Sequence, residues 1–487
     1  MSATTVLSAA TSAAAPVAAQ AIQELFARQQ VRAAQLRQQP DVAARAARLR
    51  RLSQWITDNR AAIQQALYAD FRKPAPETDV TEIWSTQTEI KHTLQHLKQW
   101  TRPRRVGTPL PLVGTRSWVQ PEPKGVCLII APWNYPFYLA LDPLVSALAA
   151  GNCCIIKPSE MTPSVAALLS RLAAEVFSPD EVAVVEGDKD VATELLRLPF
   201  DHIFFTGSPQ IGKVVMRAAA EHLTSVTLEL GGKSPAIVDQ TADLRDAAEK
   251  IVWGKSINAG QTCVAPDYVL VHEQVRDQLV EEIGAVVRRF YDAEGQGVAA
   301  SDSLARIVND HHFRRVLGLL DDARQRGATV ALGGTTDAAQ RFIEPTVLLN
   351  VPPESRVLEE EIFGPLLPML TFRTLSEAAA EVNSRPHPLA LYIFSQRKEH
   401  QQQLLRDIPA GGACLNETIL HLGHPDLPFG GFGHSGIGRA HGHAGFLAFS
   451  NEKAVLKQCV GFTGLKPIYP PYTSKVKQLV GWLLRWL

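Results

Sequence analysis

The chain has 487 residues, a length that suggests two or three domains. Lys and Arg together number 49, as do Asp and Glu, so the formal net charge is zero and the basic surplus of a nucleic-acid-binding protein is absent. The six cysteines have neither the spacing of a metal site nor the density of a disulfide scaffold, which suits free thiols in the cytoplasm and no bound metal.

The first part of the chain reads as a leader followed by helices. Residues 1–20, rich in Ala, Ser and Thr, lack the basic start and the apolar core of a secretory signal, and we expect a disordered leader there. Between residues 21 and 100, apolar residues recur at helical spacing and predict long helices over Ile22–Leu36 and Val42–Gln65. Residues 104–123, rich in Pro, Gly and β-branched residues, indicate an extended arm or hairpin.

From Gly125 onward, short apolar segments alternate with amphipathic ones, which indicates parallel β-α-β units. The alternation restarts at Ser225 and continues to about Leu415, so two successive α/β halves are predicted. The expected strands are Val126–Ala131, Cys153–Lys157, Val182–Val185, His202–Phe205, Tyr268–Val271, Pro368–Phe372 and Leu391–Phe394. The expected helices are Leu139–Ala150, Ser164–Phe177, Ile211–His222 and Asp310–Arg326.

A glycine-rich turn follows the predicted strand that ends at Phe205. Gly207 and Gly212 flank this turn, where a phosphate could approach the N-terminus of the next helix. Their G-x-x-x-x-G spacing departs from the usual dinucleotide-binding pattern, so an ordinary strand-to-helix turn stays open as an alternative. The literal G-x-G-x-x-G at Gly431–Gly436 follows no strand, and Gly232-Lys233-Ser234 lacks the first glycine of a P-loop; both are therefore rejected.

Three polar residues stand out from apolar or glycine-rich surroundings. Cys263 lies in a loop of small residues that can leave a sulfur accessible, although a lone cysteine is more often a buried apolar residue. Glu229 interrupts an apolar strand, either as an ion-paired structural carboxylate or as a general base whose pKa is raised by burial. Asn134 follows a predicted strand, either as a turn residue or as a donor to a developing oxyanion.

Seven motifs follow one another along residues 125–438. They are Pro132-Trp133-Asn134-Tyr135-Pro136, Lys157-Pro158-Ser159-Glu160, Phe205-Thr206-Gly207-Ser208, Leu228-Glu229-Leu230-Gly231-Gly232-Lys233-Ser234-Pro235, Gly260-Gln261-Thr262-Cys263, Glu360-Glu361-Ile362-Phe363-Gly364-Pro365 and Pro428-Phe429-Gly430-Gly431. In this order they resemble the aldehyde dehydrogenase family. The resemblance implies an α/β fold with a Rossmann-type cofactor domain over residues 21–228, an α/β catalytic domain over 229–422, and an oligomerisation arm. Residues 423–473 would then form a glycine-rich loop and a C-terminal arm.

The family's catalytic roles fall on the three polar residues. Cys263 would attack the aldehyde carbon, while the Asn134 side chain and the Cys263 backbone N–H would hold the oxyanion. Glu229 would activate the water that hydrolyses the resulting thioester. Lys157 and Glu160 would contact the adenosine ribose. The residues expected to bind NAD or NADP are Trp133, Lys157, Glu160, Gly207, Ser208, Ile211, Gly212, Leu230, Glu361 and Phe363.

The segments Cys263-Val264-Ala265-Pro266-Asp267-Tyr268 and Tyr469-Pro470-Pro471-Tyr472 resemble the class 3 branch, which includes fatty, aromatic and coniferyl aldehyde dehydrogenases. The branch implies a homodimer. Glu160 should repel a 2′-phosphate, so we expect NAD to be preferred, with NADP also accepted. Medium- or long-chain aliphatic aldehydes are the first expected substrates, and aromatic or coniferyl-type aldehydes the second. A CoA-acylating enzyme and an inactive homologue are alternatives that the joint presence of Cys263, Glu229 and Asn134 disfavours.

The C-terminal residues 474–487 predict an amphipathic helix. Its apolar face comprises Val476, Leu479, Val480, Leu483, Leu484 and Leu487, with tryptophans at 482 and 486 and most basic residues on the other side. Two interpretations stay open. The helix packs on its own or a partner subunit, over the substrate entrance, or it rests on a membrane surface and makes the enzyme peripheral there. It is too short and too charged to span a bilayer.

Overall fold

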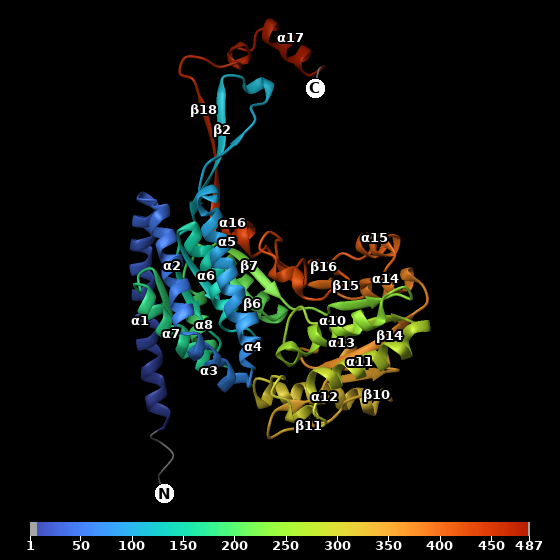
Figure 1. Ribbon diagram of the computed structural model, residues 1–487. Helices are drawn as coiled ribbons and strands as arrows, with labels where there is room; N and C mark the ends of the chain where they lie inside the picture. Colours follow the sequence, from blue (N-terminus) through green and yellow to red (C-terminus); the bar gives the residue numbers. More distant parts are fainter. Residues whose placement is uncertain (1–6, 486–487) are drawn as a thin grey trace.

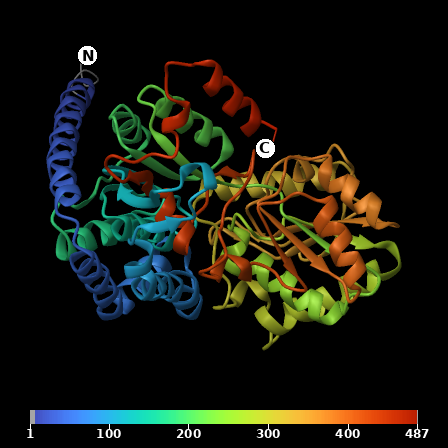
Figure 2. The same cartoon turned by 90° about the horizontal axis from the view of Figure 1, so that it is seen from above.

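The computed structural model describes residues 7–485 as two α/β lobes with an arm that projects from the first. Figure 1 shows the first lobe in blue and green, the second in yellow and orange, and the arm above them. Figure 2, seen from above, shows the two lobes side by side. The chain crosses from the first lobe to the second after residue 230 and returns after residue 415.

The first lobe contains a sheet with helices on both faces. Its strands are β3 Val126–Ile130, β4 Cys153–Lys157, β5 Val182–Val184, β6 His202–Gly207, β7 Ser225–Leu230 and β17 Gly436–Ile437, in the spatial order β17-β7-β6-β3-β4-β5. The following helices are α6 Tyr138–Ala150, α7 Pro163–Val176, α8 Lys189–Leu196 and α9 Pro209–Ala220. Only β17 runs antiparallel to its neighbour. Cys127 and Ile129 enter one apolar cluster and Val126 and Leu128 another, because successive side chains of a strand point to opposite faces.

Residues 7–100 are helical. The elements are α1 Leu7–Gln38, α2 Val42–Asp58, α3 Arg60–Phe71, α4 Ala75–Thr78, the π-helical turn η1 Asp79–Trp84 and α5 Ser85–Trp100. A disordered leader was predicted for residues 1–20, but residues 7–20 belong to the helix α1, because the alanine-rich sequence there favours helix. Residues 1–6 lie outside the described part of the chain. The helix predicted over Val42–Gln65 is interrupted at Asn59, where α2 ends and α3 begins.

The second lobe contains another mostly parallel sheet. Its strands are β8 Pro235–Val238, β9 Tyr268–His272, β10 Thr329–Leu332, β13 Thr346–Leu349, β14 Leu366–Phe372, β15 Ala390–Phe394 and β16 Gly412–Leu415, in the order β10-β13-β14-β9-β8-β15-β16. Its other elements are α10 Leu244–Ser256, η3 Ile257–Gly260, η4 Glu273–Val275, α11 Arg276–Tyr291, η5 Val298–Ala300, α12 Asp310–Gln325, α13 Arg356–Glu359, α14 Leu375–Asn383, α15 Lys398–Asp407, η6 Leu420–Gly423, and the small pair β11 Thr336–Asp337 and β12 Phe342–Ile343. The boundary predicted between residues 228 and 229 falls inside β7, because the first sheet extends to Leu230.

The arm joins two distant parts of the chain. It is built from β1 Arg104–Val106, η2 Leu110–Leu112, β2 Thr115–Pro123, β18 Ser450–Gln458, η7 Lys466–Ile468 and α17 Ser474–Leu483, and α16 Gly442–Ala448 precedes β18. β2 pairs antiparallel with both β1 and β18, so β18 is an edge strand (Figure 1). The predicted tail helix is α17, which has no buried residue; positions 486 and 487 lie outside the described residues. Among residues 7–485, no helix is long and apolar enough to cross a membrane.

Candidate active site

Cys263 lies in a constrained loop between η3 and β9. Asn258 and Ala259 in η3 have left-handed backbones, with φ of 52° and 53°. This conformation is costly for a residue with a Cβ and persists only where the surroundings hold it. The side chain of Gln261 does so, because its amide donates to the Asn258 carbonyl at 2.9 Å and accepts from the Val308 backbone N–H at 2.9 Å. The thiol of Cys263 is left half-buried at the end of this loop.

Asn134 is tied to the same loop from the other lobe. It follows β3 at the carboxyl edge of the first sheet, where ligands of parallel sheets bind. Its Nδ2 donates to the Gln261 carbonyl at 3.1 Å, and its own carbonyl accepts from Nδ2 of Asn258 at 2.7 Å. Only 3% of Asn134 is exposed. The structure therefore brings a buried amide next to the loop that carries the thiol.

Glu229 lies on β7 and is 6% exposed. Neither carboxylate oxygen has a hydrogen-bond partner within the described residues. Burial raises the pKa of Glu229 well above its usual value; Arg439 opposes this shift, and Asp142 adds to it. A buried carboxyl without a fixed partner is free to exchange protons with a water molecule, as a general base must.

The charges that act on the Cys263 sulfur indicate which carboxyl groups lie near it. Burial, and then the negative charges of Glu361 and Glu229, raise the pKa of Cys263 to about 12. Charges act strongly at this thiol only from nearby groups in a poorly hydrated site. The same region thus contains a protonated thiol, two carboxyl groups and the Asn134 loop.

The predicted phosphate turn lies between β6 and α9. Ser208 is the N-cap of α9, and its Oγ accepts from the Ile211 backbone N–H at 3.4 Å. Ile211 is 52% exposed on the first turn of the helix. A Cβ at Gly212 would lie 2.8 Å from Cδ2 of Leu230, so the glycine permits α9 to approach β7 closely. Gly207 precedes the cap at the end of β6.

Lys157 and Glu160 lie where β4 ends. The buried Nζ of Lys157 donates to the carboxylate of Glu160 at 2.6 Å, and the Glu160 side chain is 45% exposed. The pair stands at the carboxyl edge of the sheet that also carries Asn134, so it faces the same side of the lobe.

Glu361, Phe363 and Trp133 meet where the lobes face each other. Glu361 accepts from the Gly232 backbone N–H at 3.1 Å, and burial and Asp267 raise its pKa to about 8. The Phe363 ring packs edge-on against Trp133, with ring centroids 5.2 Å apart. Residues from both lobes are therefore in contact here.

The family model described as the aldehyde dehydrogenase family matches residues 4–455. The chain belongs to the aldehyde dehydrogenase family. It is 45% identical to the 4,4'-diaponeurosporen-aldehyde dehydrogenase of Staphylococcus aureus, over 91% of this chain and 95% of that protein. It is also 45% identical to a probable coniferyl aldehyde dehydrogenase of Pseudomonas aeruginosa, over 94% and 95%. The solved substrate-bound state of Staphylococcus aureus AldH superposes with a TM-score of 0.90 at 43% identity, covering 95% of this chain and 99% of that one.

The chain is also 42% identical to the aldehyde dehydrogenase family 3 member B3 of Mus musculus, over 90% of each protein. These comparisons confirm the predicted family, its class 3-like branch and the α/β fold. The protein is an NAD(P)-dependent oxidoreductase that converts small-molecule aldehydes to carboxylic acids. The residues present fit such a cofactor, because the first turn of α9 carries the exposed Ile211 and the N-terminus of this helix is available to a phosphate. When bound, the nicotinamide supplies the hydride acceptor.

Sequence reasoning missed two groups of polar residues. One comprises the buried Lys73 and Glu82 and the partly buried Glu77, from the segment before α5. The other comprises Glu89, Tyr138, Asp142 and His441, in which the Tyr138 hydroxyl lies 3.2 Å from Nε2 of His441. For Glu89 and Asp142, which lie on α5 and α6, the available signal was a charged residue at an apolar helical position, which more often indicates a solvated helix face.

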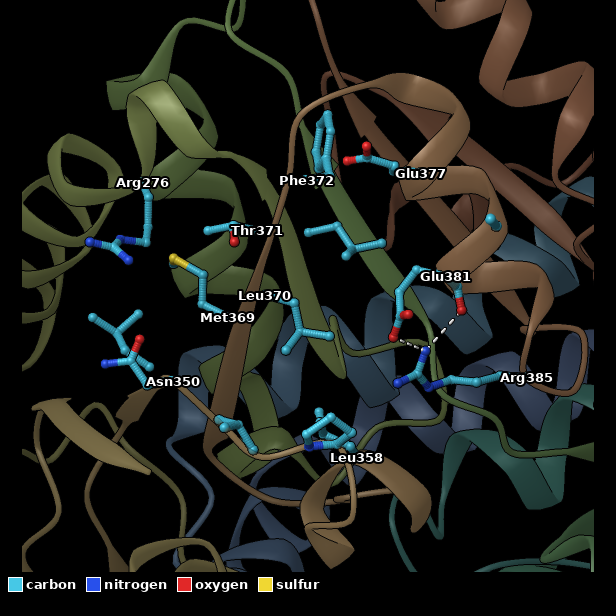
Figure 3. A pocket seen from close by; sticks show the side chains of 15 residues that line it. Arg276, Asn350, Leu358, Met369, Leu370, Thr371, Phe372, Glu377, Glu381 and Arg385 are labelled. Atoms are coloured by element: carbon cyan, nitrogen blue, oxygen red, sulfur yellow. Dashed lines mark hydrogen bonds and ion pairs between the residues drawn. The ribbon is translucent and has the colours of Figure 1, made fainter. Parts of the chain in front are cut away.

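A separate hollow of about 630 Å³ lies in the second lobe (Figure 3). It contains none of the predicted site residues, and its lining includes Leu270, Met369, Leu370 and the paired side chains of Glu381 and Arg385. In Figure 3 the guanidinium of Arg385 points to Glu381. Both charges of the pair are therefore satisfied within the protein. No group of His, Cys, Asp and Glu side chains that could hold a metal ion occurs in residues 7–485.

Proposed function

We propose that the oxidation proceeds through a thioester on Cys263. The sulfur gives its proton to a water molecule and adds to the aldehyde carbon, and the carbonyl oxygen becomes an oxyanion. A nicotinamide cofactor held beside Glu361 and Phe363 would accept the hydride from that carbon, which would leave the acyl group on sulfur. Water then breaks the carbon–sulfur bond, releases the acid and restores the thiol.

Asn134 and Glu229 supply the remaining roles in this proposal. The Asn134 amide and the Cys263 backbone N–H donate to the oxyanion, and each such donor is worth about 3 kcal/mol. Glu229 accepts a proton from the attacking water. The observation that carries the proposal is the hydrogen bond of 3.1 Å from the buried Asn134 amide to the loop that ends in Cys263. Glu229 and Glu361 lie near enough for their charges to raise the pKa of that thiol.

Replacement of the nucleophile tests the proposal. We expect Cys263→Ala to abolish NADH formation with an aldehyde while the variant retains its fold. Cys459→Ala, which removes an exposed thiol on the arm, is the matched control and should retain the wild-type rate. Turnover by Cys263→Ala would overturn the mechanism. Adding CoA to the assay tests the acylating alternative, which requires that CoA accelerate acyl release.

NAD is the proposed preferred cofactor, with NADP accepted less well. Glu160 supports this proposal, because its exposed carboxylate next to Lys157 would repel a 2′-phosphate. The proposed contacts also include Trp133, Gly207, Ser208, Ile211, Gly212, Leu230, Glu361 and Phe363. Measurement of kcat/KM for both cofactors tests the preference, and Glu160→Gln should shift it toward NADP. A wild-type preference for NADP would contradict the proposal.

The proposed substrates are medium- or long-chain aliphatic aldehydes, with aromatic or coniferyl-type aldehydes as the second candidate. The name of the Pseudomonas aeruginosa relative supports the second candidate. A comparison of kcat/KM across aliphatic aldehydes of increasing length, benzaldehyde and coniferaldehyde separates the two. The first candidate requires kcat/KM to rise with chain length above the value for coniferaldehyde.

We also propose a homodimer in which α17 contacts either the partner or a membrane surface. The nine-residue edge strand β18 supports self-association, since an unpaired strand edge can pair with another chain. Light scattering of the purified protein tests the dimer. Flotation with liposomes, compared with a truncation after Tyr472, tests the membrane contact. Equal flotation of the two proteins would exclude it.

A further inference from the structure

We propose that the segment Lys73–Glu82 is a brace that aligns the Asn134 loop with the Cys263 loop. The inference rests on the proposed roles of those two residues in catalysis. It concerns what fixes the position of Asn134 relative to Cys263, because Asn134 comes from the first lobe and Cys263 from the second. An active site assembled from two lobes needs a fixed contact between them. Three links contribute to it: the first lies within the first lobe, and the second and third cross to the second lobe.

The first link is a charge pair with no access to water. Nζ of Lys73 lies 2.7 Å from Oε1 of Glu82, and both side chains are 0% exposed. The other oxygen of Glu82 accepts from the Tyr138 backbone N–H at 2.8 Å, at the start of α6. Buried ion pairs seldom stabilise a fold more than apolar side chains of the same size would. Here the pair holds the turn between Asn134 and α6 in place.

The second link crosses from that turn to the nucleophile loop. Nζ of Lys73 lies 4.3 Å above the ring of Tyr135, a cation–π contact. The Tyr135 hydroxyl lies 2.7 Å from Oγ1 of Thr262, and both are buried. Tyr135 adjoins Asn134 and Thr262 adjoins Cys263 in the chain. This hydrogen bond therefore joins the immediate neighbours of the oxyanion donor and the nucleophile.

The third link supports the strained backbone before the nucleophile. Oε1 of Glu77 accepts from the backbone N–H of Asn258 at 2.8 Å, where the backbone is left-handed. Asn258 in turn donates through Nδ2 to the carbonyl of Asn134. The π-helical turn η1 lies between Glu77 and α5 and carries Glu82, and such turns are frequent at functional sites.

The links have a kinetic consequence. Oxyanion stabilisation requires donors 2.7–3.1 Å from the oxygen that becomes charged, which is a narrow tolerance. A displacement of about 1 Å at an active site costs on the order of 10²-fold in rate. Loss of the Tyr135–Thr262 hydrogen bond should therefore slow hydride transfer without unfolding the protein.

A double-mutant cycle tests the second link. We expect Tyr135→Phe and Thr262→Val each to lower the NADH burst rate per titrated site about tenfold, and the double variant to be no slower than either. Thr262→Ser keeps the hydroxyl and should retain the rate. Tyr68→Phe, at an exposed tyrosine on α3, is the matched control. Single variants at the wild-type rate, or effects that multiply in the double variant, would overturn the proposal.

A second readout does not depend on turnover. In a Cys459→Ser background without cofactor, alkylation of Cys263 by iodoacetamide reports the position of the thiol, and we expect Tyr135→Phe to change its rate at least threefold. An alkylation rate equal to that of the unsubstituted background protein would contradict a brace. Failure of the thioester mechanism is recognised separately, because Cys263→Ala would then still oxidise aldehydes.

The buried charge pair is tested by replacing both partners together. Lys73→Met alone would leave Glu82 uncompensated in the interior and could prevent folding. The combination of Lys73→Met with Glu82→Gln keeps the volume and removes both charges, so its Tm should stay close to that of the wild type. We expect this folded variant to show a burst rate about tenfold below wild type. A wild-type burst rate in the folded double variant would refute the role of the pair.

Discussion

Replacement of Glu229 by glutamine should separate the two halves of the reaction. The side chain is buried and its oxygens have no partner in the described part of the chain, so glutamine fits the same space without breaking a hydrogen bond of the protein. The substitution removes the base proposed for thioester hydrolysis. It also removes one of the negative charges that raise the pKa of Cys263.

The substitution should lower the rate of thioester hydrolysis but raise the reactivity of the Cys263 thiol. General-base catalysis contributes about 10²–10⁴-fold, so thioester hydrolysis should slow by about 10³-fold, or about 4 kcal/mol. Acylation should be retained, because Cys263 and Asn134 are untouched. The pKa of Cys263 should fall, since removal of a neighbouring negative charge favours the thiolate. Alkylation of the thiol at pH 9 should then be faster than in wild type.

Stopped-flow absorbance of NADH measures both steps. We expect a burst of about one NADH per active site, followed by a steady-state rate about 10³-fold lower. Hydroxylamine, a strong external nucleophile, should accelerate release of the acyl group in the variant. Glu281→Gln, at an exposed position on α11, is the matched control and should behave as wild type. Loss of the burst, or an unchanged steady-state rate, would refute the role assigned to Glu229.

Three further predictions follow from the buried groups. Asp142 raises the pKa of Glu229, so Asp142→Asn should lower the pKa of Glu229 and move the rising limb of the kcat–pH profile to lower pH. A shift of that limb to higher pH would contradict this prediction. Burial, and then Asp142, raise the pKa of Glu89 to about 7. A raised carboxyl pKa contributes to the free energy of unfolding below about pH 4.5, and this contribution is lost as pH rises through about 7. Glu89→Gln has no such group, so its free energy of unfolding should rise by up to about 3 kcal/mol relative to that of the wild type between pH 5 and pH 8. Urea unfolding at both pH values measures this difference. An equal difference at both pH values would exclude this linkage. Gly212→Ala places a Cβ 2.8 Å from Leu230, so the KM for NAD should rise about tenfold while Tm changes little. Initial rates measure the KM, and calorimetry measures the Tm. An unchanged KM would count against the packing argument.

The sequence predicted the elements whose signals are local. The strands Cys153–Lys157 and Val126–Ala131 were visible as short apolar runs, and the structure has β4 and β3 at these positions, β3 one residue shorter. The break at Asn59 was missed, because apolar spacing continues on both sides of it. The start of α1 was missed because a low-complexity composition does not separate helix from disorder.

Residues of the candidate site that lie in sequence motifs could be predicted, whereas residues placed there only by long-range contacts could not. Cys263, Glu229 and Asn134 were predicted to be catalytic from their neighbours in the chain, and this stays a prediction. Nothing near Lys73 or Glu82 in the sequence indicates that the two charges meet without access to water. The two residues are only nine positions apart, but their burial depends on how α6 and the rest of the first lobe pack around them, which neither periodicity nor composition encodes.

The protonated state of the Cys263 thiol has a consequence for survival under oxidative stress. Peroxides react with the thiolate, and burial together with the nearby negative charges favours the protonated thiol of Cys263, which disfavours sulfenic acid formation there. Cys459 on the arm is instead exposed to peroxide in solution.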